Sequence, residues 1–256
     1  MANLGNPKNT IEIIQKYEFM FQKKFGQNFL IDTHVLEKII SAAGITKDDC
    51  VLEIGPGIGT MTQYLAENAG HVVAVEIDRN LIPILKETLA DYDNVTVINE
   101  DILRVDIKAL AEEYNGGKPI KVVANLPYYI TSPVIMKLLE DRLPITSITV
   151  MVQKEAAERL CAQPGTRECG AVSAAVQYYA EPEILFEVSR GSFMPAPNVD
   201  SAVIQLRIRK EPPVDVHDEA LFFRVIRAAF AQRRKTAVNS ISNTLHMSKQ
   251  QVTDAF

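Results

Sequence analysis

The stretch VLEIGPGIGT, residues 51–60, passes from an apolar run into three closely spaced glycines at positions 55, 57 and 59. Glycine allows a sharp turn of the main chain and lets a ligand approach it closely. A buried strand that enters such a loop and then a helix is typical of open α/β sheets, whose ligands bind at the carboxyl ends of the strands. We therefore expect a ligand beside Gly55 and Gly57.

Similar apolar runs recur along the chain, with segments of helical spacing between them. They are HVVAVEI (71–77), VTVIN (95–99), KVVA (121–124) and SITVMV (147–152). This alternation predicts a mostly parallel sheet covered by helices on both faces. Two later runs, EILFEV (183–188) and SAVIQLRI (201–208), have no comparable helix between them. We expect these two to pair antiparallel at one edge of the sheet.

The composition of the chain and a proline-rich segment within it predict two domains. The chain has 256 residues, of which 47% are hydrophobic and 23% charged, as in soluble globular proteins. A Pro- and Asp-rich segment, KEPPVDVHD (210–218), precedes the helical pattern LFFRVIRAAFAQRRK (221–235). We place a boundary near residue 211, between a large α/β domain over residues 1–210 and a small helical domain over residues 211–256.

Charge is unevenly distributed. The net charge is −5, yet residues 221–256 hold six Lys and Arg against Asp254 and so carry +5, which leaves −10 on the preceding residues. The candidate contacts for a polyanion are Arg224, Arg227, Arg233, Arg234 and Lys235. A basic segment on an acidic body predicts a localised contact with nucleic acid. The alternative is a solvated helix face.

Some classes of function are disfavoured. Cys50, Cys161 and Cys169 are odd in number and lack metal-ligand spacing, and the four histidines are scattered. This pattern predicts no metal site and a reduced, cytosolic setting. The chain has no apolar run near the roughly 18 residues that a membrane span needs. Its first residues, MANLGNPKNT, also lack the apolar core of a secretory signal.

Acidic residues end two of the predicted strands. Glu76 lies 21 residues after Gly55, where it could accept both hydroxyls of a ribose, and Asp101 follows the next strand, where it could face an adenine amino group. A nicotinamide dinucleotide usually prefers G-x-G-x-x-G. Here the loop reads GPGIGT with Glu53 two residues ahead, which is similar to the first motif of S-adenosylmethionine-dependent methyltransferases. This favours S-adenosylmethionine, with a dinucleotide as the alternative.

The segment NLPYYI, residues 125–130, follows the fourth predicted strand. It is similar to the [DNS]-[ILP]-P-[FY] motif of methyltransferases that act on exocyclic amino groups. The side-chain oxygen of Asn125 and the carbonyl of Leu126 could accept hydrogen bonds from such an amine, and Pro127 restricts the geometry of Leu126. The ring of Tyr128 could stabilise the positive charge that develops on nitrogen. The alternative is a turn with two core tyrosines.

Together these motifs resemble those of the KsgA-type small-subunit (16S) ribosomal RNA adenine dimethyltransferases, in the KsgA/Erm superfamily. The matching stretches are KKFGQNFLID (23–32), VLEIGPGIGTMT (51–62), VEID (75–78), NEDIL (99–103), VVANLPYYITSPV (122–134), MVQKEAAERL (151–160) and FMPAPNVDSAVIQL (193–206). The resemblance implies a Rossmann-like class I methyltransferase fold, whose mostly parallel sheet has an antiparallel edge, followed by a small C-terminal α-helical domain.

The resemblance also implies the reaction. Its members use S-adenosylmethionine to dimethylate the N6 groups of two adjacent adenosines in a hairpin near the 3′ end of 16S rRNA, during assembly of the small subunit. They are cytoplasmic and usually monomeric. Departures from the family pattern are Cys169-Gly170, where Tyr-Gly is common, and the end of the chain at Phe256, which leads us to expect an incomplete second domain.

Site residues follow from the resemblance position by position. The implied cofactor contacts are Asn28, Leu30, Gly55, Gly57, Glu76, Asp101 and Asn125. The implied base contacts are Asn125, Leu126, Pro127, Tyr128 and Phe193, with core packing as the alternative for Phe193. Residues 1–30 are expected to form an arm over the site, in which Lys23 and Lys24 would contact RNA unless they are merely solvated.

Three rival functions remain open. An Erm-type enzyme would methylate an adenine of 23S rRNA, although FMPAPNVDSAV and NLPYY favour the KsgA type. A non-catalytic assembly factor could use the same scaffold to bind rRNA, but the intact NLPY, Glu76 and Asp101 speak against it. A nicotinamide-dependent dehydrogenase is the third.

Overall fold

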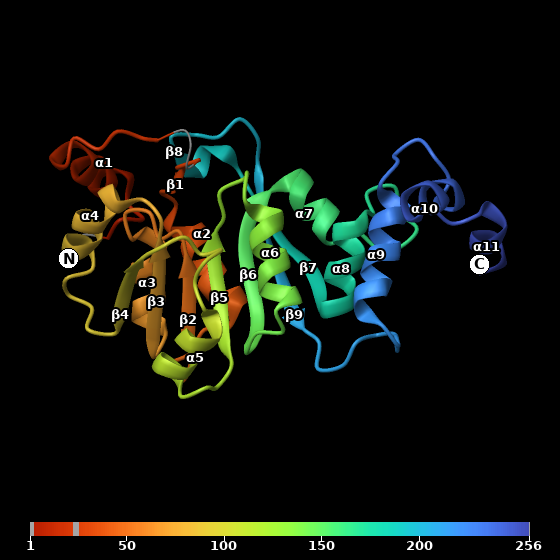
Figure 1. Ribbon diagram of the computed structural model, residues 1–256. Helices are drawn as coiled ribbons and strands as arrows, with labels where there is room; N and C mark the ends of the chain where they lie inside the picture. Colours follow the sequence, from red (N-terminus) through yellow and green to blue (C-terminus); the bar gives the residue numbers. More distant parts are fainter. Residues whose placement is uncertain (1–2, 23–25, 256) are drawn as a thin grey trace.

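The computed structural model describes residues 3–22 and 26–255. Within these residues one sheet contains the strands β2 (Cys50–Ile54), β3 (His71–Glu76), β4 (Val95–Asn99), β5 (Ile120–Asn125), β6 (Ile145–Gln153), β7 (Ala180–Val188) and β9 (Ser201–Ile208). Their order across the sheet is β4-β3-β2-β5-β6-β9-β7 (Figure 1). The strands from β4 to β6 run parallel, and β9 pairs antiparallel with both β6 and β7. The predicted parallel sheet with an antiparallel edge is confirmed.

Helices cover both faces of this sheet (Figure 1). They are α2 (Thr33–Ala43), α3 (Thr60–Asn68), α4 (Ile82–Thr88), α5 (Ile107–Asn115), α6 (Thr131–Glu140), α7 (Lys154–Leu160) and α8 (Ala171–Tyr179). Successive strand residues point to opposite faces. Accordingly, Val51 and Val123 pack with side chains of α2 and α3, whereas Leu52 and Val122 pack with side chains of α5 and α6. The double covering explains the nearly continuous apolar strands.

A second, two-stranded sheet was not predicted. β1 (Phe29–Leu30) pairs antiparallel with β8 (Phe193–Met194). The Ile31 amide extends the pairing by donating to the Ser192 carbonyl at 2.9 Å, and the Ser192 hydroxyl donates to Asp32 at 2.9 Å. Two residues per strand are too few for any periodicity to be recognised in the sequence. The pairing holds the segment 26–30 in place.

The first described residues of the chain pack against the body of the molecule. Helix α1 (Pro7–Lys16) precedes Tyr17, whose hydroxyl donates to Glu87 on α4 at 2.6 Å. The Lys16 ammonium contacts the same carboxylate at 2.5 Å. The Leu4 amide donates to the side chain of Gln63 on α3 at 3.1 Å. Residues 3–17 are therefore held on α3 and α4.

Three helices complete the described chain: α9 (Glu219–Phe230), α10 (Ala237–Leu245) and α11 (Lys249–Asp254). Figure 1 places them at the opposite end of the molecule from α1 and α4. Phe223 of α9 packs on Tyr178 and Tyr179 of α8. Ala228, Ile241 and Val252 form a small core that joins the three helices. Within the described chain no helix is long and apolar enough to cross a membrane.

Glu219 links α9 to the rest of the molecule. Its carboxylate accepts hydrogen bonds from Tyr179 at 2.6 Å and from Tyr178 at 3.2 Å, and it pairs with Arg142. Hydrogen bonds from Tyr179 and Arg142 hold the pKa of Glu219 below its ordinary value of 4.5. An acid with a lowered pKa stabilises the fold above its ordinary pKa and loses this contribution as pH falls.

We predict that Glu219→Gln loosens α9. Because the carboxylate is partly exposed, the free energy that holds α9 in place should fall by only about 1 kcal/mol. Amide hydrogen exchange in α9 should become faster at neutral pH, and the difference from the wild type should shrink as pH falls below the ordinary pKa of 4.5. Glu168→Gln, at an exposed loop residue, is the matched control. Equal exchange in both variants at neutral pH would contradict the proposed link.

Candidate active site

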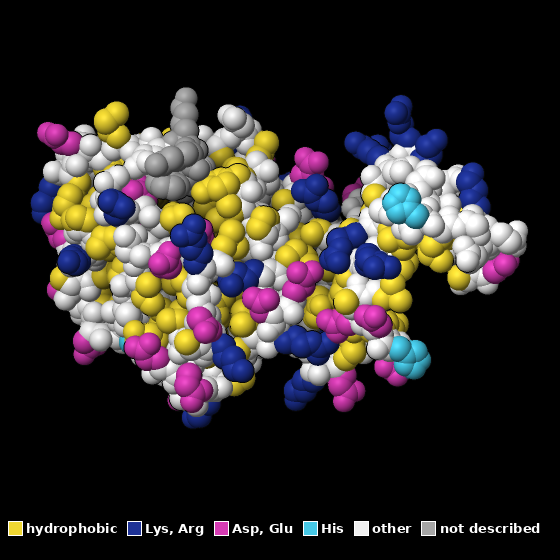
Figure 2. Space-filling model, in the orientation of Figure 1, with side chains coloured by type: hydrophobic (Ala, Val, Ile, Leu, Met, Phe, Trp, Pro, Cys, Tyr) yellow, Lys and Arg dark blue, Asp and Glu magenta, His cyan; other side chains and the backbone are white. Residues whose placement is uncertain are grey.

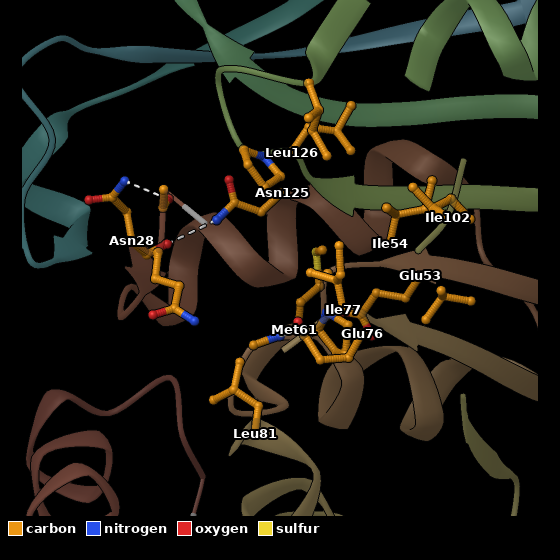
Figure 3. Close-up of a pocket in the computed structure, with 18 of the residues that line it drawn as sticks. Asn28, Glu53, Ile54, Met61, Glu76, Ile77, Leu81, Ile102, Asn125 and Leu126 are labelled. Carbon is orange, nitrogen blue, oxygen red and sulfur yellow. Dashed lines mark hydrogen bonds between the residues drawn. The ribbon is translucent and has the colours of Figure 1, made fainter. Parts of the chain in front are cut away.

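One pocket lies at the carboxyl edge of the parallel strands, and its volume is about 220 Å³. It is lined by residues 26–30, 53–57, 75–77, 100–103 and 125–130, together with Thr60, Met61 and Leu81. All the expected cofactor contacts and four of the five expected base contacts are among these residues. The residues approach from the segment before α2, from the glycine loop and from the ends of β3, β4 and β5 (Figure 3).

The glycine loop needs glycine for two different reasons. Gly55 and Gly57 have φ values of +70° and +62°, a region that side chains disfavour. A Cβ atom on Gly57 would also lie 3.0 Å from the ring of Phe29. A Cβ atom on Gly55 would meet no described atom within 4 Å, so at this position the main chain borders open space in the pocket. This arrangement leaves room for a ligand against the loop.

Glu76 is the last residue of β3 and is 4% exposed. Its carboxylate accepts hydrogen bonds from the amides of Gly57 at 3.1 Å and Asp78 at 2.8 Å. Burial raises the pKa of Glu76 to about 7, although these amides partly oppose the change. The carboxylate is thus attached to the glycine loop by hydrogen bonds from main-chain amides.

Asp101 follows β4 and also lines the pocket. Its carboxylate accepts a hydrogen bond from the Leu103 amide at 2.9 Å, which fixes the side chain in a tight turn. Asp101 and Glu76 therefore occupy neighbouring strand ends, as the spacing of the sequence predicts.

Asp78 is a supporting residue that the sequence motifs did not single out. It is 2% exposed. Its carboxylate accepts hydrogen bonds from Gln27 at 2.8 Å and from the Asn80 amide at 3.1 Å. It thereby fastens the segment 26–30 to the end of β3. An acid two residues after Glu76, within VEID, was the available signal.

The side chain of Asn125 is oriented by the segment 26–30 (Figure 3). Its amide nitrogen donates to the carbonyl of Asn28 at 3.1 Å. The amide nitrogen of Asn28 in turn donates to the carbonyl of Gly26 at 3.0 Å. Because the NH₂ group of Asn125 is occupied in this way, its oxygen is left to accept a hydrogen bond from a ligand.

Leu126 and Tyr128 are fixed by contacts outside the pocket. The Leu126 amide donates to the Met151 carbonyl at 3.1 Å, and the Leu126 side chain is buried. Among the described residues, no hydrogen bond is donated to the Leu126 carbonyl. The Tyr128 hydroxyl lies 3.2 Å from the hydroxyl of Ser201 at the start of β9. The segment therefore has the acceptor and the aromatic ring that the motif requires.

Glu53 is a second buried acid of the pocket. It is fully buried on β2, and neither carboxyl oxygen has a hydrogen-bond partner among the described residues. The nearby hydroxyls of Thr60 and Thr62 are also buried and unpartnered there. Burial raises the pKa of Glu53 to about 8, and the negative charge of Glu76 reinforces this change. Glu53 is therefore mostly protonated at neutral pH, a state that the motif did not reveal.

The remaining candidates lie elsewhere. Phe193 is 4% exposed and packs in the core beside Leu30, so the structure does not bring it among the pocket residues. The basic residues Arg224, Arg227, Arg233, Arg234 and Lys235 are exposed on α9 and on the loop to α10. Figure 2 shows Lys and Arg side chains gathered over that loop. Lys23 and Lys24 lie outside the described residues.

The cysteines and possible metal ligands form no further site in the described chain. Cys50, Cys161 and Cys169 are free thiols. Among the described residues, no group of three His, Cys, Asp or Glu side chains could hold a metal ion. At the unusual Cys169-Gly170 pair, the Gly170 amide donates to the Ser173 hydroxyl at 2.9 Å, and this bond helps to begin α8. The pair therefore has a local structural role.

A glycine loop, two acids at successive strand ends and an NLPY segment around one pocket define a methyltransferase that uses S-adenosylmethionine. The family model for ribosomal RNA adenine dimethylase (RrnaAD) matches residues 18–255. The chain belongs to this family.

Named relatives support the assignment of the chain to this family. The "Ribosomal RNA small subunit methyltransferase A" of Lachnoclostridium phytofermentans is 64% identical over 258 residues, covering 100% of this chain and 89% of the relative. The protein of the same name in Clostridioides difficile is 52% identical over 252 residues, covering 98% and 87%.

Two solved structures are similar at lower identity. A dimethyladenosine transferase from Plasmodium falciparum has a TM-score of 0.71 and 30% identity, covering 85% of this chain and 78% of that one. The 23S rRNA methyltransferase ErmE has a TM-score of 0.68 and 29% identity, covering 84% of both chains. The predicted fold class is confirmed, and the Erm type is the more distant relative.

We predict that the two buried acids make the free protein less stable as pH rises. An acid with a raised pKa favours the folded state below its unfolded pKa, near 4.5, and loses this effect as pH rises through its folded pKa, about 8 for Glu53. The free energy of unfolding should fall by about 1 kcal/mol or more for each pH unit between about pH 5 and 8. Urea denaturation of Glu53→Gln should show a clearly shallower fall, since only Glu76 still titrates. Identical slopes in both proteins would contradict the placement of Glu53.

Proposed function

We propose that this chain transfers methyl groups from S-adenosylmethionine to the N6 groups of two adjacent adenosines in a hairpin near the 3′ end of 16S rRNA, during assembly of the small subunit. The observation that carries the proposal is the meeting of Asn125, Leu126 and Tyr128 with Glu76 and Asp101 in one pocket. Relatives named as small-subunit methyltransferases, at 52–64% identity, support the choice of RNA.

The pocket residues fit the cofactor. Glu76 would accept the ribose hydroxyls, and Asp101 would accept the adenine amino group. Gly55, Gly57, Asn28, Leu30 and Asn125 would hold the methionine part against the main chain. The open space at Gly55 and the buried carboxylate of Glu76 at the end of β3 support this fit. When bound, the cofactor supplies an electrophilic methyl group on a sulfonium, so the protein needs no side-chain nucleophile.

The residues of NLPY would prepare the amine. The lone pair of an adenine amino group is delocalised into the ring, so the amine is a poor nucleophile. Hydrogen bonds accepted by the Asn125 oxygen and the Leu126 carbonyl favour a pyramidal nitrogen, whose lone pair can then face the methyl group. The ring of Tyr128 would stabilise the developing positive charge. The Ser201 contact would keep that ring in position.

The helices after residue 211 would contribute RNA affinity. We propose that residues 211–256 act as a small domain whose exposed basic side chains contact phosphates, while residues 1–210 carry the methyltransferase site. Phe193 is proposed to support the base site from behind Leu30, with which it pairs. We further propose a monomer that acts in the cytoplasm, where small subunits assemble.

Labelled-methyl transfer tests the proposed function directly. Unmethylated small and large subunits are incubated separately with the protein and labelled S-adenosylmethionine, and the modified bases are mapped. We expect dimethyladenosine at two adjacent positions of the small-subunit RNA. Label confined to an adenine of the large subunit would show an Erm-type enzyme. RNA binding without any transfer would show a non-catalytic assembly factor.

We predict that Asn125→Ala slows the chemical step about 10²- to 10³-fold, because it removes one preorganised acceptor at the amine. Single-turnover rates at saturating RNA and cofactor measure this step. Tyr128→Phe should be milder than Tyr128→Ala, since a ring face survives the first change. Asn68→Ala removes an exposed amide at the far end of α3 and serves as the control. A nearly normal rate for Asn125→Ala would show that NLPYY is only a turn.

We predict that replacing Arg233, Arg234 and Lys235 together by Ala weakens RNA binding. The dependence of log K on log salt should become flatter by about 0.7–0.9 for each phosphate that the protein no longer neutralises. Cofactor affinity should not change. A triple variant at Lys86, Lys108 and Lys118, which are exposed on the large domain, removes the same charge and should keep the slope. Equal slopes in the two triple variants would show that the cluster is only a solvated face.

A further inference from the structure

Tyr129 is the second tyrosine of NLPYYI, and the chemistry proposed above does not use it. Tyr128 is half-buried and held by Ser201, whereas Tyr129 is 54% exposed. It nevertheless lines the same pocket as Glu76 and Asp101. A large aromatic side chain that is exposed yet borders a pocket has apolar surface left for a ligand to cover.

The ring of Tyr129 lies beside the main chain of Gly26. A Cβ atom on Gly26 would be 3.7 Å from both Cδ1 and Cε1 of this ring. Gly26 has a φ of +58°, a conformation that favours glycine. Because glycine has no side chain, the main chain of Gly26 can lie close to the ring of Tyr129. The side-chain amide of the neighbouring Gln27 donates a hydrogen bond to the Asp78 carboxylate at 2.8 Å. The ring therefore bridges the gap between the NLPYYI segment and a fixed part of the N-terminal segment.

The other surroundings of Tyr129 point to the adenosine side of the pocket. Burial raises the pKa of Tyr129, and the negative charges of Asp101 and Glu76, which line the same pocket, raise it further. The same strand ends contribute Ile77 and Leu103 to the pocket lining, and both are exposed. Tyr129 thus shares one pocket with the acids assigned to the adenine and ribose and with exposed apolar side chains that a nucleoside could cover.

From this arrangement we propose that Tyr129 forms an aromatic wall over the adenosine half of the bound cofactor. The flat ring would pack against the nucleoside and shield it from solvent, so that it slows dissociation of both S-adenosylmethionine and the demethylated product. This inference rests on the proposed function, because it takes the cofactor and the roles of Glu76 and Asp101 from it.

Calorimetric titration of two ligands tests whether Tyr129 packs against the adenosine half of the cofactor. S-adenosylmethionine carries both halves of the cofactor, and methylthioadenosine carries the adenosine half without the charged methionine groups. Tyr129→Ala should weaken both ligands by the same factor, about tenfold, and should speed their dissociation similarly. Tyr129→Phe should stay within about twofold of the wild type, and Tyr129→Leu should lie between, since it keeps apolar bulk without a flat face. Phe230→Ala removes a ring of similar exposure on α9 and should change neither affinity.

The outcomes separate the inference from the function on which it rests. A wild-type protein that binds neither ligand would overturn both. The wild-type protein could instead bind both ligands, with unchanged affinities in folded Tyr129→Ala and Tyr129→Leu. That result would overturn only the proposed role of Tyr129. Unchanged cofactor affinity with weaker binding of the RNA hairpin would also overturn it, and would show that Tyr129 stacks on a base instead.

Discussion

Parallel pairing of four strands is the constraint on which the rest of the site depends. β4, β3, β2 and β5 are neighbours, and their registers align Ile54 with Val75 and with Ala124, and Glu76 with Asn99. Their carboxyl ends therefore meet at one edge of the sheet. Groups far apart in the chain, from the glycine loop to NLPYYI, become neighbours because each follows one of these strands. Helices on both faces of the sheet bury β2, β3 and most of β5.

The remaining wall of the site comes from outside the main sheet. The two-residue pairing of β1 with β8 and the bond between Gln27 and Asp78 hold the segment 26–30 across the strand ends. The carbonyl of Asn28 then orients the amide of Asn125. In this way a short ladder near the N-terminus leaves the side-chain oxygen of Asn125 free to accept a hydrogen bond in the pocket. The two buried acids of the pocket have raised pKa values, so ligand charge and protonation are coupled there.

Much of this arrangement could be predicted from the sequence, because it depends on local patterns. The strand runs, the glycine loop and the acids at strand ends are each readable within about ten residues, and parallel pairing then brings them together. The β1–β8 ladder and the choice of Gln27 as the partner of Asp78 could not be predicted, since each joins residues far apart through contacts that leave no periodic signal. The buried state of Phe193 and the protonation of Glu53 likewise depend on what packs around them in three dimensions.

The central claim is that the carboxyl edge of the sheet binds S-adenosylmethionine through Glu76. Calorimetric titration of the wild type and of Glu76→Ala tests this most directly, with a nicotinamide dinucleotide as the competing ligand. We expect the wild type to bind S-adenosylmethionine and not the dinucleotide. The folded variant should bind S-adenosylmethionine more weakly by about 1.5–3 kcal/mol, as expected for the loss of a charge-assisted hydrogen bond. Unchanged affinity in a folded Glu76→Ala protein would contradict the claim.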